Sequence, residues 1–578
     1  MLDVLNRANT PSSTLSNPVG LRHDQWTPLE GLLHWEKSQP DSVFLSQPLA
    51  TGVQDYTWKE TAAQVRRMAS YLQSLEYPKG SRIALLGKNS AHWMMADLAI
   101  WMAGHVSVPV YPSLNPKTFQ YILEHSDSRL IILGQVDDWQ TMADGLNIDT
   151  PVVCLPGTSL ELQSKSIQCW ESIISTECPV AHVNMPHEDD LATIVYTSGT
   201  TGVPKGVMLS FKSFQVSSQA YSQVAPVCLE DRMLSYLPLA HVFEGAVVFA
   251  TALRHGCQIF FIESLATFNR DIKRARPTIF HCVPRLWVKF QQSIFRSVSE
   301  AELNQQLQNP DTASACRQAV LESLGLDQVK FAVSGSAPLP TRLLQWYWDI
   351  GLELLEGYGM SEDFSYSHFS RPDAKRIGYV GQPLDGVERR IDTQGEVLIK
   401  SPARMLGYYL EPEKTLDAFT SDGYFKTGDM GSLDELGRLR ITGRIKELFK
   451  TSKGKYVAPA PIENKLMTNQ IIEVACVMGA GEAQPVGLLM LNAETVLKMS
   501  PDEVSKLTHE LTDLKNAVNT SLDPHEQLAC LVVVNQQWTI ANGFLTPTMK
   551  IRRNIIEERY SEQIEGWVNC AKPVVWQL

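Results

Sequence analysis

The hydrophobic and polar positions of this chain alternate between two spacings. Between Trp58 and Leu75, apolar residues recur at about every third or fourth position, which predicts an amphipathic helix. Short apolar runs at 82–86 (Arg-Ile-Ala-Leu-Leu) and 130–133 (Leu-Ile-Ile-Leu) are instead typical of buried strands. Helical patterns near 93–102 and 119–125 separate such runs. This alternation predicts a layered α/β architecture with largely parallel sheets.

The same alternation resumes after residue 192 and later changes character. Strand-like runs at 278–283 and 330–333 continue the α/β series. The segment 297–315 is rich in Gln, Glu and Ser, and we interpret it as a surface excursion. Around 396–400 the strands become shorter and are separated by Gly and Asp, which indicates a more twisted β region.

A smaller unit with an α+β pattern begins at about Glu447. Its expected elements are three strands and one helix, at 474–478, 486–491, 531–534 and 502–514. We therefore predict an α/β fold with two domains. A large N-terminal domain of layered sheets and helices, with a β-rich subdomain, covers residues 1–445, and a small mobile α+β domain covers 446–578.

Length and composition agree with this division. The 578 residues exceed what one compact core supports, so at least two domains are expected. The chain carries 51 basic and 63 acidic residues, a net charge of -12, which makes it a poor general binder of nucleic acid. No pair of the ten cysteines has CxxC spacing, so neither a zinc site nor redox chemistry is indicated.

The most apolar long stretch, 93–111, does not have the pattern of a membrane span. Asp97, His105 and Pro109 interrupt it, and it fits a buried helix that leads into a strand. The first residues lack the apolar core and cleavage site of a secretory signal. We therefore expect a soluble cytoplasmic protein without a transmembrane segment, and peripheral membrane contact stays open.

A glycine-rich loop is the strongest chemical signal. Residues 196–206 read Tyr-Thr-Ser-Gly-Thr-Thr-Gly-Val-Pro-Lys-Gly and follow a predicted strand at 191–195. Glycines permit close backbone approach, hydroxyls donate hydrogen bonds, and a lysine adds positive charge, so the string is suited to polyphosphate. It is not a Walker loop, because Pro204 precedes the lysine and Gly206 follows it. The candidate phosphate-binding residues are Ser198, Gly199, Thr200, Thr201, Gly202 and Lys205.

Six further strings follow this loop in order along the chain. They read Leu-Pro-Leu-Ala-His-Val-Phe-Glu, Val-Ser-Gly-Ser-Ala-Pro-Leu, Leu-Glu-Gly-Tyr-Gly-Met-Ser-Glu, Gly-Tyr-Phe-Lys-Thr-Gly-Asp, Ile-Thr-Gly-Arg-Ile-Lys-Glu-Leu and Leu-Thr-Pro-Thr-Met-Lys, beginning at residues 237, 333, 355, 423, 441 and 545. Together with the loop they resemble the adenylate-forming (AMP-binding) superfamily. That superfamily contains acyl-CoA synthetases, luciferases and peptide-synthetase adenylation domains. The resemblance runs from about Asp41 to about Ile555.

The resemblance assigns roles in the large domain. It implies that His241 lies at the acyl and phosphate site, that the Tyr358 ring lies against adenine, and that Glu362 binds Mg²⁺, with Thr197 completing the metal site. Ser361 stands where family members commonly have Thr, and it keeps the hydroxyl that lies near the α-phosphate. The remaining nucleotide-site residues are Gly335, Ser336, Ala337, Glu356, Gly357, Gly359 and Met360.

Four residues at and beyond the predicted domain boundary complete the carried-over site. Asp429 and Arg444 match residues that contact the ribose hydroxyls, and Lys446 matches the interdomain hinge. Lys550 matches the mobile catalytic lysine, whose ammonium can bridge the attacking carboxylate and the α-phosphate. The expected catalytic residues are therefore Lys205, His241, Glu362 and Lys550.

The resemblance implies ATP, Mg²⁺ and coenzyme A as cofactors, and a fatty acid as substrate. The strings at 237–244 and 355–362 resemble long-chain fatty acyl-CoA synthetases more than acetyl-CoA or aryl enzymes. Lys453 stands where the family commonly has Gly, near the thiol tunnel. Phe243 and the apolar run 246–252 fit an acyl channel or the core equally well. Three alternatives stay open: transfer to an acyl carrier protein, adenylation in lipid or polyketide tailoring, and a catalytically silent nucleotide-binding homologue.

Overall fold

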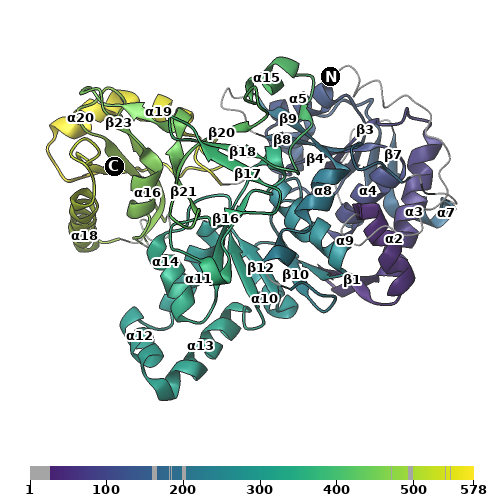
Figure 1. Ribbon diagram of the computed structural model, residues 1–578, viewed down its shortest axis with the longest axis horizontal. Helices are drawn as coiled ribbons and strands as arrows, with labels where there is room; N and C mark the ends of the chain where they lie inside the picture. Colours follow the sequence, from purple (N-terminus) through teal and green to yellow (C-terminus); the bar gives the residue numbers. More distant parts are fainter. Residues whose placement is uncertain are drawn as a thin grey trace.

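The computed structural model describes residues 26–158, 164, 166–180, 183, 185–197, 203–224, 226–469, 471–492, 499–540, 542–546 and 549–577. Two large, mainly parallel sheets form the body of the molecule, and helices cover them (Figure 1). One sheet has the spatial order β19 (Gly407–Tyr408), β9 (Lys205–Ser210), β8 (Leu191–Thr197), β4 (Val106–Val110), β3 (Arg82–Leu86), β5 (Ser128–Leu133), β6 (Val152–Cys154), β7 (Ile167–Cys169). The predicted α/β class is therefore confirmed.

The second large sheet supplies the strand ends that matter for the site. Its spatial order is β16 (Gln382–Pro383), β15 (His368–Phe369), β14 (Leu354–Tyr358), β13 (Phe331–Ser334), β12 (Ile279–Cys282), β10 (Arg232–Ser235), β11 (Gln258–Phe261), β1 (Val43–Leu49), β2 (Gly52–Thr57). Strands β10 to β14 run parallel, so their carboxyl ends meet at one edge. In open sheets of this kind, ligands bind at that edge.

The helices follow the hydrophobic pattern. The predicted helix at 58–75 is α3 (Trp58–Ser74), and it starts at a capping box in which Thr57 and Glu60 exchange hydrogen bonds. Every residue of α4 (Ala91–Met102) is buried, as expected for a helix that is apolar on all sides. Both helices pack in the same core as the two sheets.

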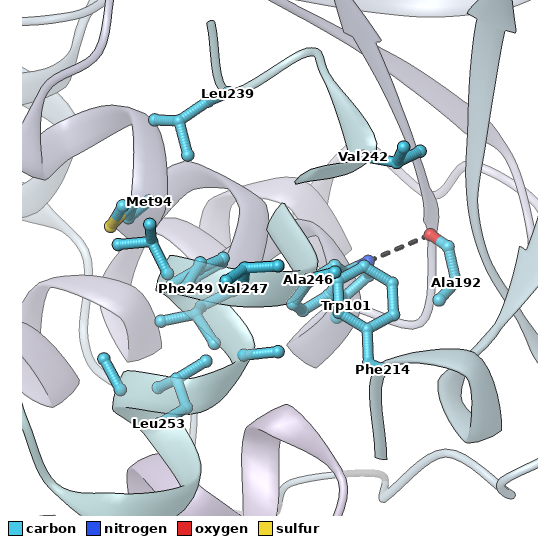
Figure 2. Packing of buried hydrophobic residues seen from close by; sticks show 14 of the residues in the cluster. Met94, Trp101, Ala192, Phe214, Leu239, Val242, Ala246, Val247, Phe249 and Leu253 are labelled. Atoms are coloured by element: carbon cyan, nitrogen blue, oxygen red, sulfur yellow. Dashed lines mark hydrogen bonds between the residues drawn. The ribbon is translucent and has the colours of Figure 1, made fainter. Parts of the chain in front are cut away.

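The core beneath the 237–244 segment is dense (Figure 2). The Trp101 indole of α4 donates to the carbonyl oxygen of Ala192 at 2.9 Å, and it meets the Phe214 ring edge-on, with 5.0 Å between ring centroids. Phe249 stacks on the other side of Trp101. Phe249 belongs to η3 (Glu244–Ala250), a π-helix that follows His241 directly. The apolar run after Glu244 is therefore core packing in this structure.

A third sheet and a hairpin of helices lie beyond this body. The sheet is antiparallel, in the order β17 (Glu388–Ile391), β18 (Glu396–Lys400), β20 (Phe425–Leu433), β21 (Leu439–Arg444), as the change of pattern near 396 predicted. The expected surface excursion at 297–315 is helical: α12 (Glu300–Gln308) and α13 (Pro310–Leu324) project from the body (Figure 1).

The last part of the chain forms its own mixed sheet. The strands β24 (Ile472–Met478), β25 (Val486–Leu491), β26 (Leu531–Val533) and β27 (Val574–Trp576) pack with α16 (Pro459–Leu466), α18 (Pro501–Thr520) and α19 (Arg553–Tyr560). Helix α18 runs six residues beyond the predicted end, and Val518 is still buried there.

A crevice of about 360 Å³ separates this C-terminal part from the body. One wall comes from α11 (Pro284–Phe295) and the start of α14 (Thr341–Asp349), through Phe295 and Leu343. The opposite wall comes from the turn after α16, through Met467, and from Glu510 of α18. In the described part of the chain, no helix combines the length and apolarity that a bilayer span needs.

Candidate active site

The predicted phosphate loop connects two paired strands. Strand β8 ends at Thr197, β9 begins at Lys205, and these two residues are register partners. At Gly206 a Cβ atom would lie 2.9 Å from the Ile194 side chain, so the position requires glycine. The predicted residues Ser198, Gly199, Thr200, Thr201 and Gly202 lie outside the described residues. The hairpin fixes Thr197 and Lys205 at the two ends of the loop.

Lys205 and Glu362 are brought together by a residue that the sequence did not single out. The Nζ atom of Lys205 lies 4.6 Å from the centroid of the Tyr408 ring. The Tyr408 hydroxyl donates to Oε1 of Glu362 at 2.8 Å. Burial, and then the Glu362 carboxylate, raise the pKa of Tyr408 above its usual value, so the hydroxyl remains a donor. The string Gly-Tyr-Tyr at 407–409 carries no ligand signature, and only the pairing of β19 with β9 reveals its place.

The oxygen donors here fit Mg²⁺. Glu362 belongs to η4 (Ser361–Asp363), and Tyr408 is its only side-chain hydrogen-bond partner within the described ranges, which leaves Oε2 for a hard cation. No group of three or more His, Cys, Asp or Glu side chains in the described residues could hold an ion alone. An ion bound by one carboxylate and a hydroxyl, completed by substrate phosphates, is the arrangement that Mg²⁺ favours.

The predicted adenine-contacting turns lie side by side at the ends of β13 and β14. Ser334 and Glu356 are register partners, so the turn Gly335-Ser336-Ala337 lies beside Glu356-Gly357-Tyr358. Ser336 has a left-handed backbone, with φ 70°. A Cβ atom at Gly359 would lie 2.7 Å from the backbone of Ser365, so only glycine permits that approach. Met360 follows, and its N–H donates to Asp363 at 2.8 Å, which leads the chain into Ser361 and η4.

Glu356 differs from the other residues of these turns in its charge state. Its side chain is buried, and burial raises its pKa to about 7, although backbone donors from Leu339 and Gly378 oppose the shift. The group therefore titrates near neutrality.

Asp429 is the centre of a second cluster. It is 4% exposed and accepts a hydrogen bond from the Tyr358 hydroxyl at 2.7 Å. Its other oxygen pairs with Nε of Arg444 at 2.7 Å, and the two residues are register partners on β20 and β21. Three residues predicted from separate motifs thus meet at one carboxylate.

Lys550 faces the same cluster from the C-terminal part. Its loop is closed by an antiparallel bridge between Leu545 and Ile551. Lys550 is exposed to solvent, yet surrounding protein atoms lower its pKa from 10.5 to about 8. The Arg444 guanidinium also lowers this pKa, whereas Asp429 and Glu447 raise it. The predicted hinge residue Lys446 is exposed in η6 (Ile445–Glu447), immediately after Arg444.

His241 completes the group around Lys550. Burial, and then the charge of Lys550, lower the pKa of His241 to about 3, so the imidazole is neutral near pH 7. Its Nδ1 accepts the backbone N–H of Phe243 at 3.2 Å. The ring proton therefore resides on Nε2, and His241 is a hydrogen-bond donor there.

Two further residues hold the His241 segment, and the sequence did not single them out. Asn89 accepts from the Leu239 N–H at 3.1 Å and donates to the Leu237 carbonyl at 2.6 Å. Glu244 pairs with His281 at 3.2 Å, and both side chains are fully buried. Their chemistry gives no local signal, because Asn89 and His281 are far from the segment in sequence.

Comparison with known proteins identifies the family of the chain. A family model described as AMP-binding enzyme matches residues 32–409, and one described as AMP-binding enzyme C-terminal domain matches 447–571. The chain is 30% identical to long-chain-fatty-acid–CoA ligase FadD15 of Mycobacterium bovis, over 92% of this chain and 96% of the relative. It is 28% identical to long-chain-fatty-acid–CoA ligase 1 of Homo sapiens, over 90% of this chain and 83% of the relative.

Solved structures agree on the fold. The anthranilate CoA ligase AuaEII, in complex with anthranoyl-AMP, superposes with a TM-score of 0.74 at 20% identity, over 93% of this chain and 99% of that chain. The adenylation domain of a carboxylate reductase from Mycobacterium chelonae gives a TM-score of 0.79 at 21% identity, over 98% of this chain and 93% of that chain.

Proposed function

The chain belongs to the AMP-binding enzyme family and is an acid–thiol ligase, and from this premise we propose that its acid is a long-chain fatty acid and its thiol is coenzyme A. The observation that supports the adenylation step is the electrostatic coupling of Lys550 with His241 and with the Asp429–Arg444 pair. Acyl-adenylate formation requires a mobile cation, a neutral hydrogen-bond donor and a carboxylate that can bind the ribose hydroxyls.

The first half-reaction forms the acyl-adenylate. A carboxylate oxygen bonds to the α-phosphorus of ATP, the bond from that phosphorus to the bridging oxygen of the β-phosphate breaks, and pyrophosphate leaves. Lys205 neutralises the departing phosphates. Nε2–H of His241 donates to the oxygen on which negative charge develops, and the Lys550 ammonium offsets the same charge.

The nucleotide is held by the two clusters of the large domain. Tyr358 and the turn 335–337 flank adenine, while Asp429 and Arg444 bind the ribose hydroxyls. Glu362 and Thr197 would hold Mg²⁺, which screens the phosphate charge when bound.

The second half-reaction needs a different face of the small domain. The coenzyme A sulfur bonds to the acyl carbon, the bond to the adenylate oxygen breaks, AMP leaves, and the thiol proton is lost to solvent. A turn about Lys446 would exchange the Lys550 loop for the hairpin β22–β23 (Phe449–Lys450 and Tyr456–Val457). That hairpin exposes three lysines, which suit the phosphates of coenzyme A: Lys450, Lys453 and Lys455.

The long-chain assignment rests on the relatives and on the His241 string. Two relatives named as long-chain-fatty-acid–CoA ligases cover most of the chain. The run after Glu244 is packed into the core, and the partly buried Phe243, which lies against the turn at Gly335, is the residue of this string that we propose to contact the acyl chain.

The deciding experiment measures both halves on purified protein. Pyrophosphate release is followed with fatty acids of increasing length, acetate, benzoate and an amino acid, and thioester formation is then compared with free coenzyme A and with an acyl carrier protein. We expect the longer fatty acids and free coenzyme A to give the highest kcat/KM. Faster turnover with acetate or an aryl acid would refute the substrate, and preference for the carrier protein would refute the acceptor.

A further inference from the structure

Tyr408 joins two residues whose chemistry is otherwise separate. Its ring lies beneath the Lys205 ammonium at 4.6 Å, and its hydroxyl donates to Glu362 at 2.8 Å. We propose that Tyr408 is a positioning residue that aims the Glu362 carboxylate at Mg²⁺ and holds Lys205 at the phosphates of ATP. This inference rests on the proposed function and adds a residue that links metal binding to phosphate binding.

Burial and backbone hydrogen bonds hold Tyr408 in a fixed position. Its side chain is 5% exposed, and its N–H donates to the Thr415 hydroxyl at 2.8 Å. The next residue, Tyr409, donates its N–H to the carbonyl of Gly206, directly after Lys205. The preceding Gly407 has φ 145°, and a Cβ atom there would lie 3.0 Å from Thr415. The ring and hydroxyl of Tyr408 are therefore fixed relative to β9 before any ligand arrives.

Glu362 has a second attachment to the same segment. Its backbone carbonyl accepts from the Met405 N–H at 2.7 Å, so the segment 405–408 holds both the backbone and the side chain of this residue. With Oε1 engaged by Tyr408, the orientation of the carboxylate plane is set and Oε2 is directed elsewhere. A carboxylate fixed in this way loses less conformational freedom when it ligates an ion.

The two contacts of Tyr408 use different parts of the side chain. The hydroxyl serves Glu362, whereas the ring face serves Lys205 through a cation–π contact. Tyr408→Phe therefore removes the first and keeps the second, and Tyr408→Leu removes both. If Tyr408 only filled space, the two variants would not differ in which contact they lose.

The test follows ATP binding by calorimetry, with and without Mg²⁺. In wild type, Mg²⁺ should tighten ATP binding. In Tyr408→Phe, the Mg²⁺ concentration for half-maximal tightening should rise about tenfold, the size expected for one lost hydrogen bond to a charged group. Affinity for ATP without Mg²⁺ should stay at the wild-type value, and saturating Mg²⁺ should restore most of kcat. Tyr408→Leu should also weaken ATP binding without Mg²⁺.

Tyr409→Phe is the matched control. Its ring contacts His125 on the far side of β19, so its Mg²⁺ dependence should equal that of wild type. Thermal unfolding of each variant separates loss of stability from loss of positioning, and if Tyr408→Leu fails to fold, Tyr408→Phe decides the question. Wild-type Mg²⁺ dependence in Tyr408→Phe, or an equal shift in Tyr409→Phe, would overturn the inference. A wild-type protein that binds no ATP would instead refute the proposed function.

Discussion

Arg444 and Lys550 bring two cations to one carboxylate, Asp429, and the structure holds them in opposite ways. Arg444 ends a strand, is in register with Asp429 and pairs with it at 2.7 Å. Lys550 sits on a loop of the C-terminal part, after Met549 with its left-handed φ of 62°. Within the described ranges its Nζ atom has no hydrogen-bond partner, and it interacts with Asp429 only through charge.

This difference in anchoring distinguishes a residue that binds the nucleotide from a residue that acts in one chemical step. A group that must hold ribose through both half-reactions benefits from a fixed ion pair, whereas a group needed for one step must be able to leave. Helix α19, which begins just after the Lys550 loop, is anchored: its Arg553 makes a buried bidentate pair with Glu463 at 2.7 and 2.9 Å. The chain that follows the loop is therefore fixed within the C-terminal part.

Lys550→Ala should have the largest effect. Adenylation should lose about 2–4 kcal/mol of transition-state stabilisation, as for removal of one preorganised charge-stabilising donor. Thioester formation from supplied acyl-adenylate should stay near the wild-type rate, because in the proposed mechanism Lys550 has left the site before that step. Both rates are measured on one preparation, with the exposed Lys506→Ala of α18 as control. Equal losses in the two half-reactions would break the comparison.

Asp429→Asn comes next. Loss of the charge removes the Arg444 ion pair and weakens the hydrogen bond from Tyr358. We therefore expect kcat/KM for ATP to fall roughly thirtyfold, which corresponds to about 2 kcal/mol of lost transition-state stabilisation. Because Asp429 raises the pKa of Lys550, the variant should also lower that pKa. An unchanged pH profile would mean that the Asp429 carboxylate does not affect the pKa of Lys550.

The pH dependence of the wild type should show a smaller effect. With the pKa of Lys550 at about 8 in the free enzyme, the ammonium is present below that pH and is lost above it. The adenylation kcat/KM should therefore fall as pH rises through about 8. In Lys550→Arg this descending limb should disappear from the range up to pH 10, because a guanidinium stays charged there. Persistence of the limb in that variant would assign it to another group.

Tyr358→Phe should have the smallest effect. It removes one neutral donor from Asp429 and keeps both the aromatic ring and the Arg444 pair, so KM for ATP should rise about fivefold, near 1 kcal/mol. A loss as large as that of Asp429→Asn would show that the hydroxyl, and not the ion pair, orients the carboxylate.

Much of the fold could be predicted from periodicity. The predicted and observed bounds agree closely where an apolar pattern has clear ends. Strands β18 and β25 occupy the predicted ranges, and helix α3 starts at Trp58 as predicted. The helices α12 and α13 were not predicted. Leu303 is the only buried residue of α12, so that helix shows no apolar periodicity, whereas α13 buries residues at helical spacing. Their starts were readable only from caps, such as the box of Ser299 with Glu302.

The candidate site divides in the same manner. Lys205, Glu362, Asp429 and Lys550 came from strings that resemble a known family. The structure places Lys205 near Glu362 and Asp429 near Lys550. Tyr408 could not be found in that way, because its proximity to Lys205 arises from the pairing of β19 with β9, about 200 residues apart in sequence. Local patterns carry composition and period, but they carry no information on which distant strands become neighbours.

The crevice between the body and the C-terminal part offers a means of observing the enzyme at work. Its walls come from α11 and α14 on one side and from Met467 and Glu510 on the other, so the rotation about Lys446 that we propose would change its width. A donor dye at Glu510 and an acceptor on the projecting α12–α13 hairpin would convert that width into an optical signal. Single molecules could then be timed between ATP addition and thioester release, and the dwell in each pose would give the order of events without any mutation in the chemistry.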